Sequence, residues 1–345
     1  MMPISVIASG MVTSVGFNSA ASCAAMRAGI RNVNETNLWD AESGEMLAAG
    51  RVLLPQWWTG TGKLAELVVP AINECLLAVP LVPPTQIPLF LGVSCPARPC
   101  RPVGLDAEII GEIECRLGFP LHADSQVIPR DRVSVVVAIQ KAADLIASKK
   151  VRYCIVAAVD SLVQQDLVAY YLEQRRILTP MNSNGFSPGE AGSAILVEAA
   201  GASEQGELEF IGVGLSWEKA AIESEIPLRG DGLADAIGRA LKMAGLTVED
   251  MNYRITDIDG EHYQFKEMIF ALTRYQRKVR QDLFDIWHPM EFVGNVGAAI
   301  GPIALGIALH ASQHKYGPGP RIMCSVCNDD GERGVMLVNY KQGEK

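Results

Sequence analysis

Strand-like and helix-like apolar segments alternate along this chain, and the alternation limits the folds that it can adopt. In the first half, strand-like runs at 4–8, 88–93 and 153–159 are interleaved with helical patterns at 20–28, 64–78 and 133–147. The strand-like runs are almost continuously apolar, which is typical of strands buried on both faces. Such interleaving is the pattern of βαβ units, so we expect an α/β protein whose largely parallel sheet is covered by helices.

The pattern restarts after a polar stretch at 199–207, A-A-G-A-S-E-Q-G-E. Strand-like runs follow at 208–213, 252–258, 321–326 and 334–339, with helical patterns at 232–244, from about Phe265, and after Gly301. Two α/β halves of similar plan suggest an internal duplication, although no convincing sequence identity links them. We predict an N-terminal half at 1–200 and a C-terminal half at 206–345, joined by this linker.

Composition excludes several classes of function. The chain has 345 residues, 49% hydrophobic and 20% charged, which is enough to bury a large core. Its net charge of -9 argues against binding to nucleic acid or to an anionic membrane, and favours small molecules or proteins as partners. Residues 1–26 and 292–314 carry no charged side chain, but glycines interrupt both segments. We therefore expect buried segments there, and neither a signal peptide nor a membrane span.

The eight cysteines are dispersed and lie mostly in apolar runs. That distribution is typical of reduced thiols in the core of a cytoplasmic protein, which is the location we expect.

Four segments, in order along the chain, resemble the thiolase-fold β-ketoacyl synthases. The start, I-S-V-I-A-S-G-M-V-T-S-V-G, is similar to the family's opening strand and glycine turn. The segment N-S-N-G-F-S-P-G-E-A-G-S-A-I-L-V-E at 182–198 keeps the glycines, phenylalanine and glutamate of the family's R-D-G-F-x-x-G-E-G-A pattern. Segments 231–250 and 292–310 match the opening of the C-terminal half and the K-S-x-x-G-H segment. The resemblance implies a thiolase-like fold, with duplicated βαβαβ halves in α-β-α-β-α layers.

The family's nucleophile is missing from its expected place. In these synthases, a cysteine thiolate at a helix N-terminus takes an acyl group from a thioester. No cysteine lies between Cys115 and Cys154, and counting back from the strand at 153–159 puts Val133 at the nucleophile position, followed by Ser134. A serine hydroxyl is far harder to ionise than a thiol, so we interpret Ser134 as a helix N-cap.

The first catalytic histidine of the family is also replaced. It polarises the thioester, whereas this chain has Asp257 or Asp259 at that position, and a carboxylate would repel developing negative charge. His262 is the local candidate to substitute. Asn295 occupies the third catalytic position, where one branch of the family uses histidine and the priming branch uses asparagine.

We also considered a metal site at Asp257, Asp259, Glu261 and His262, because carboxylates suit hard cations. No EF-hand spacing or further ligand accompanies them, so an acidic loop is preferred, and neither a metal nor a cofactor is predicted.

The leading hypothesis is a ketosynthase-like protein without condensing activity that binds or assembles with a partner. The resemblance implies a homodimer or a heterodimer with a ketosynthase paralogue, and an acyl carrier protein is a further candidate partner. A second hypothesis is an active acyltransferase or decarboxylase that uses His262 and Asn295. A third is an accessory or chaperone-like protein for a secreted effector, similar to the thiolase-like proteins that accompany bacterial type VI effectors.

Overall fold

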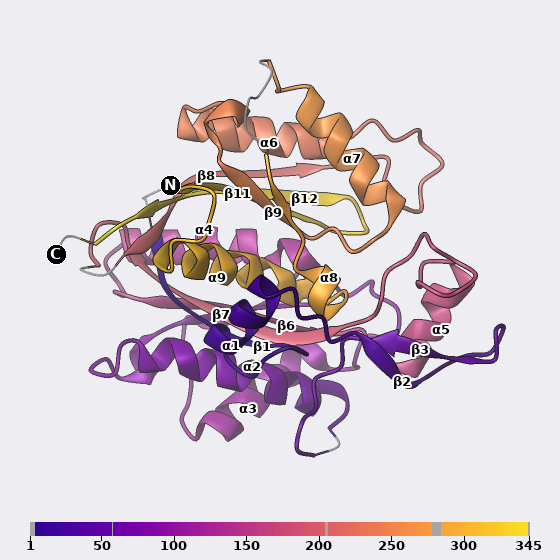
Figure 1. Cartoon of the computed structure of the whole chain (residues 1–345). Coiled ribbons are helices and arrows are strands. Elements are labelled where there is room, and N and C mark those ends of the chain that lie inside the picture. Colours follow the sequence, from indigo (N-terminus) through magenta and orange to yellow (C-terminus); the bar gives the residue numbers. More distant parts are fainter. Residues whose placement is uncertain (1–3, 57, 204–205, 278–283, 344–345) are drawn as a thin grey trace.

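The computed structural model describes residues 4–56, 58–203, 206–277 and 284–343, and it is layered α-β-α-β-α (Figure 1). The helices α2 and α3 cover one outer face, and α6 and α7 cover the other. Between the two sheet layers lie α4 and α9. The layered arrangement expected from the sequence is confirmed.

The first half contains β1 (Ile4–Val12), α1 (Ser19–Arg27), β2 (Asn34–Asp40), β3 (Glu45–Ala49), α2 (Gly60–Leu77), β4 (Leu89–Val93), α3 (Leu105–Leu117), β5 (Gln126–Pro129), α4 (Ser134–Ala147), β6 (Cys154–Ser161), α5 (Gln165–Glu173) and β7 (Glu190–Ala199). The second half contains β8 (Glu207–Trp217), α6 (Asp231–Ala244), β9 (Tyr253–Thr256), α7 (His262–Thr273), β10 (Ile286–Trp287), α8 (Met290–Val293), α9 (Ile300–Gln313), β11 (Arg321–Cys327) and β12 (Glu332–Lys341).

The strand order repeats between the halves, as the sequence pattern suggested. The first half is ordered β5-β4-β6-β7-β1 and the second β10-β9-β11-β12-β8. In each half the first three strands of that order are parallel, and the last two pair antiparallel with their neighbours. The expectation of a largely parallel sheet was therefore wrong, because the described strands form a mixed sheet. The halves join where β1 pairs with β8, at Ser5 with Glu209 and at Val6 with Leu208. We propose the predicted linker as the boundary between the halves; its positions 204 and 205 lie outside the described residues.

The largest hydrophobic core lies between the two sheet layers and draws on both halves. Helices α4 and α9 fill it with small and branched side chains such as Val136, Ile139 and Ile303. The same cluster includes Ile195 on β7 and Met336 on β12. The central core therefore belongs to neither half alone.

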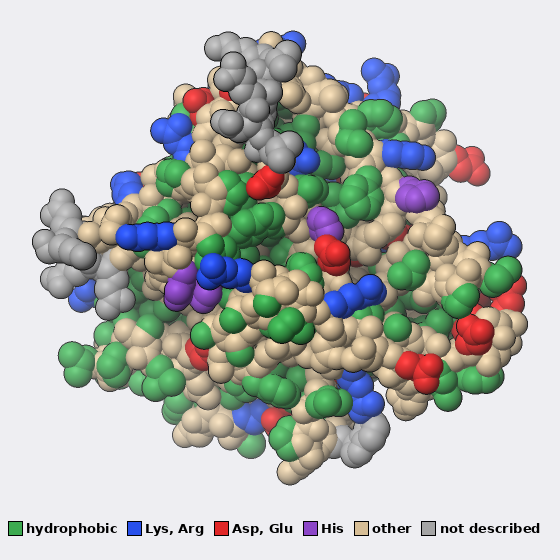
Figure 2. All heavy atoms as spheres, viewed as in Figure 1, with side chains coloured by type: hydrophobic (Ala, Val, Ile, Leu, Met, Phe, Trp, Pro, Cys, Tyr) green, Lys and Arg blue, Asp and Glu red, His purple; other side chains and the backbone are tan. Residues whose placement is uncertain are grey.

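Lys and Arg side chains are scattered among acidic and apolar ones on the face that Figure 2 shows. Among the described residues, no helix combines the length and the apolarity that a membrane crossing needs.

Candidate functional site

The turn between β5 and α4 is where the sequence resemblance places a nucleophile. Asp131 has a φ of 48°, a left-handed conformation that costs energy for a residue other than glycine. Its carboxylate accepts a hydrogen bond from the Cys95 amide at 3.1 Å and pairs with the Arg98 guanidinium. The strained turn thereby directs Asp131 and Arg132 toward a cavity. Val133 points into the central core, fully buried, and its amide donates to Asn328 Oδ1 at 3.1 Å.

Ser134 is not the N-cap that the sequence suggested. It is the first residue of α4, Val133 holds the N-cap position, and no side chain caps the helix. The Ser134 hydroxyl is buried against Gly92 on β4 and has no hydrogen-bond partner among the described residues. Without an adjacent base, this hydroxyl cannot act as a nucleophile.

Arg132 brings together three of the predicted site residues. Its Nη1 donates to Asp257 and its Nη2 to Asp259, both at 3.2 Å. Asn295 Nδ2 donates to the same Asp259 oxygen at 2.8 Å. The guanidinium is 6% exposed and the two carboxylates 4% and 0%. Burial alone would lower the pKa of Arg132, but the two carboxylates outweigh it and raise that pKa.

Burial has the opposite effect on the two carboxyl groups. It raises the pKa of Asp257 and of Asp259, and Arg132 only partly counters this shift.

Two further arginines extend this charged cluster. Arg176 makes a two-pronged contact with Glu261, both distances being 2.8 Å, and also contacts Asp329 at 2.8 Å. Arg98 contacts Asp160 at 2.8 Å, in addition to Asp131. Burial, with the repulsion of Asp259, raises the pKa of Glu261 to about 7. Asp329 differs, because the surrounding guanidiniums, Arg176 foremost, overcome the opposing effect of burial and lower its pKa.

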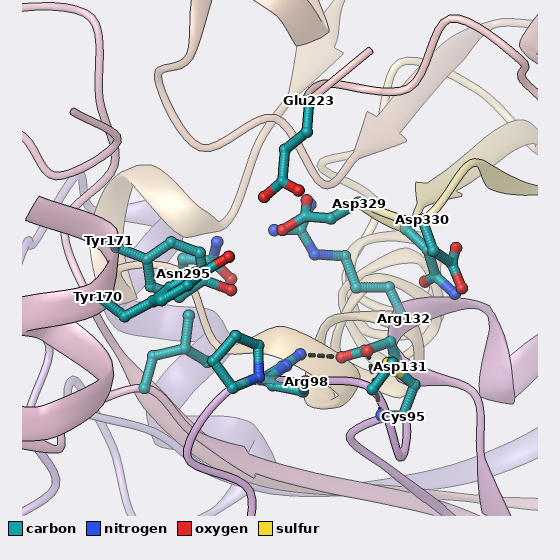
Figure 3. A pocket seen from close by; sticks show the side chains of 14 residues that line it. Cys95, Arg98, Asp131, Arg132, Tyr170, Tyr171, Glu223, Asn295, Asp329 and Asp330 are labelled. Atoms are coloured by element: carbon teal, nitrogen blue, oxygen red, sulfur yellow. Dashed lines mark hydrogen bonds and ion pairs between the residues drawn. The ribbon is translucent and has the colours of Figure 1, made fainter. Parts of the chain in front are cut away.

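A cavity of about 220 Å³ opens beside this cluster. Figure 3 shows the Tyr170 and Tyr171 rings on one side of it and Arg132 on the other, with Glu223 reaching in from a separate loop. The residues that line it are Cys95, Ala97, Arg98, Pro99, Asp131, Arg132, Leu162, Tyr170, Tyr171, Glu223, Asn295, Asn328, Asp329 and Asp330.

The structure does not bring His262 to this cavity. His262 is the first residue of α7 and is exposed, and its backbone amide donates to Asn184 Oδ1 at 2.8 Å. It does not line the cavity beside Asn295. The acyltransferase hypothesis therefore lacks the pairing of His262 with Asn295 that it needs.

Arginines contact the carboxylates that were considered as metal ligands. Asp257, Asp259 and Glu261 each contact an arginine, and the described residues contain no group of three or more His, Cys, Asp or Glu placed to hold a metal ion.

Sequence reasoning missed the three arginines that organise the site. Arg132 lines the cavity, whereas the next residue, Val133, is buried in the core. A count from β6 that differs by one residue therefore exchanges a cavity residue for a core residue. Its partners Asp257 and Asp259 lie 125 and 127 residues away in the chain. A buried arginine in an otherwise apolar segment is the signal that could have indicated this, because such a charge needs a partner.

Comparison with known proteins identifies the fold. No protein-family model matches the chain, and a search of curated proteins finds no match. A ketosynthase in complex with its chain length factor, from Xenorhabdus doucetiae, is similar at a TM-score of 0.74 and 15% identity, over 99% of this chain and 98% of that one. The ketosynthase from module 6 of the bacillaene synthase of Bacillus subtilis 168 gives 0.75 and 15%, over 99% and 72%.

A complex of a type II polyketide synthase acyl-carrier protein with its ketosynthase is also similar. Its TM-score is 0.75 at 13% identity, over 98% of this chain and 99% of that one. At such identities the likeness establishes architecture and leaves the chemistry to be argued from the site. The chain has the thiolase-like fold that is seen in ketosynthases, including those solved in complex with a chain length factor.

Proposed function

We propose that this protein is a ketosynthase-like partner that does not condense acyl groups and that assembles with a ketosynthase paralogue. The proposal rests on the position of the Arg132 side chain. This side chain lies at the turn before α4, next to Val133, where the sequence resemblance places the nucleophile, and two buried carboxylates hold it there. Because a guanidinium is not deprotonated in proteins, it cannot attack a thioester.

The surrounding groups also oppose the second half of a condensation. Decarboxylation leaves a carbanion that needs hydrogen-bond donors or positive charge close by. Asp257 and Asp259 lie there instead, and the Asn295 side chain is committed to Asp259 and to the Gly297 amide. One N–H of the Asn295 amide remains beside these two carboxylates, whose negative charge opposes a developing carbanion.

The proposed partnership is supported by the edge of the first sheet. β5 is the outermost strand of the first half and pairs only with β4 among the described strands. An open strand edge offers unpaired backbone groups to another chain. The turn that carries Arg132 directly follows β5, so a partner docked there would lie next to the site. Two of the similar structures are complexes of a ketosynthase with a chain length factor or with an acyl-carrier protein.

Intact-mass spectrometry after incubation with butyryl- and malonyl-thioesters tests the loss of condensing chemistry. Cys95 is the one thiol among the residues that line the cavity, so a Cys95→Ser variant serves as the matched control. We expect neither thioester to acylate the native protein or the Cys95→Ser variant. A stable acyl adduct on the native chain that is lost in Cys95→Ser would show a displaced nucleophile and overturn the proposal.

Light scattering coupled to size exclusion tests the assembly. The chain is measured alone and after co-expression with a ketosynthase paralogue from the same genome, and Val127→Asp on β5 is compared in both settings. We expect a heterodimer that Val127→Asp disrupts. A homodimer that excludes the paralogue, or co-purification with a secreted effector instead, would favour the alternatives.

A further inference from the structure

The guanidiniums at the cavity are already neutralised. Each one contacts two carboxylates: Arg98 pairs with Asp131 and Asp160, and Arg132 pairs with Asp257 and Asp259. An anion that enters would have to compete with these buried partners, which are held at contact distance. The two arginines therefore offer little to an anionic ligand.

Two acidic side chains at the cavity have no such partner. Glu223 makes no hydrogen bond or ion pair with any described residue, and it extends into the cavity from its loop (Figure 3). Asp330 accepts the Glu332 amide at 3.1 Å but forms no ion pair within the described part of the chain. Carboxylates gathered at a recessed opening concentrate cations there.

The wall opposite Arg132 is aromatic and contains a hydroxyl without a partner. The Tyr170 and Tyr171 rings meet edge to face, with centroids 5.4 Å apart. Tyr171 is 6% exposed, and its hydroxyl forms no hydrogen bond among the residues that the structure describes. Figure 3 shows the ends of both side chains directed toward the cavity. A tyrosine hydroxyl that faces a cavity without a partner is a place where a ligand can donate.

These features select the class of ligand. A metal ion is disfavoured, because the free carboxylates stand apart and no group of metal-binding side chains occurs among the described residues. An ammonium group on a short apolar chain meets every requirement. It can pair with Glu223 and donate to the Tyr171 hydroxyl. Its alkyl part and charge suit the Tyr170 ring, since the Arg176 guanidinium already lies 5.2 Å from the centroid of the Tyr171 ring.

We propose that this cavity binds a short alkylammonium ion. The inference deepens the proposed function and rests on it, since it takes the cavity to be free of acyl chemistry.

Titration calorimetry with n-butylammonium, n-butanol and butyrate tests the charge preference. The three probes share a chain length and differ in charge. We expect butylammonium to bind about tenfold more tightly than the alcohol or the carboxylate, and its affinity to fall as salt rises. Equal binding of the alcohol, tighter binding of butyrate, or displacement of butylammonium by equimolar Mg²⁺ would overturn the proposal.

Three variants locate the site. Glu223→Gln removes the free charge, and Tyr171→Phe keeps the ring but removes the hydroxyl. Each should weaken butylammonium binding about three- to tenfold. Glu225→Gln is the control, because Glu225 is exposed nearby on the chain but does not line the cavity, and it should leave affinity unchanged. An unchanged affinity in both Glu223→Gln and Tyr171→Phe would refute the site. The acyl-adduct experiment fails or succeeds independently of this result.

Discussion

At the scale of single residues, Arg132 is the cation that compensates the buried charges of Asp257 and Asp259. Replacing it with methionine keeps an unbranched apolar stem but removes the guanidinium, which leaves Asp257 and Asp259 buried without this cation. We expect Arg132→Met to lower the free energy of unfolding by about 3–5 kcal/mol, the usual effect of breaking a buried ion pair.

Chemical denaturation at pH 7.5 measures the change, and Arg130→Met is the matched control. Arg130 pairs with Glu332 at the surface and its side chain is 43% exposed. Its loss should cost less than about 1 kcal/mol, as for other exposed pairs. Similar losses in the two variants would mean that Arg132 contributes only as a surface charge.

Glu261 gives the site a pH dependence whose sign follows from its environment. Burial raises the pKa of Glu261 from 4.5 to about 7, so between these pH values the folded chain binds a proton that the unfolded chain has released. Stability therefore falls as pH rises from about 4.5 through 7. Asp257 and Asp259, whose pKa values are also raised, contribute with the same sign.

The corresponding variant is Glu261→Gln, whose amide oxygen can still accept from Arg176. Wild-type stability should fall by up to about 3 kcal/mol over this range because of Glu261, and the decline should be shallower in the variant. Denaturant midpoints of the wild type and of Glu261→Gln, measured between pH 4.5 and 8, test this difference in slope. Parallel curves for the two chains would show that Glu261 titrates at an ordinary carboxyl pKa.

At the scale of elements, the start of α4 depends on its contact with β4. A Cβ at Gly92 would overlap Ser134 Oγ, so the helix can approach the strand only because residue 92 is glycine. We expect Gly92→Ala to cost about 1–3 kcal/mol through overpacking. In a Ser134→Gly background the same change should cost clearly less, since the clash is with that side chain. Additive effects in this double-mutant cycle would place the strain elsewhere.

The same elements show what the sequence can predict. Helix α4 and strand β6 are long and almost wholly apolar, so their pattern predicted them within a few residues. The pattern missed β5, which has four residues and a mixed burial pattern, and α3, which buries only Leu105, Ile109 and Ile113. Short or half-exposed elements give little periodicity, and tertiary contacts decide their conformation.

For the site, the family resemblance indicated Asp257, Asp259 and Asn295, which do lie together. It did not find Arg98 or Arg176, because their partners lie far along the chain. His262 was considered because it is near Asp259 in sequence. The start of α7 leaves it at the surface, which spacing alone does not reveal.

At the scale of the whole molecule, the central core makes the two halves depend on each other. Helix α4 comes from the first half and α9 from the second, and both pack in one cluster with strand residues of each half, such as Ile195 and Met336. Separating the halves would expose this core on both sides. A fragment spanning 1–203, or one spanning 206–345, should therefore lack a cooperative transition by itself, because it loses much of its apolar burial.

Co-expression of the two fragments should restore a complex that unfolds in a single transition, like the intact chain. Thermal unfolding followed by circular dichroism, with size exclusion of the mixed fragments, measures this. Among the described residues the β1–β8 junction contributes two paired positions, so we expect the α4–α9 core rather than strand pairing to hold the restored complex. A fragment that unfolds cooperatively alone would show that one half holds an independent core, and that the predicted boundary separates two true domains.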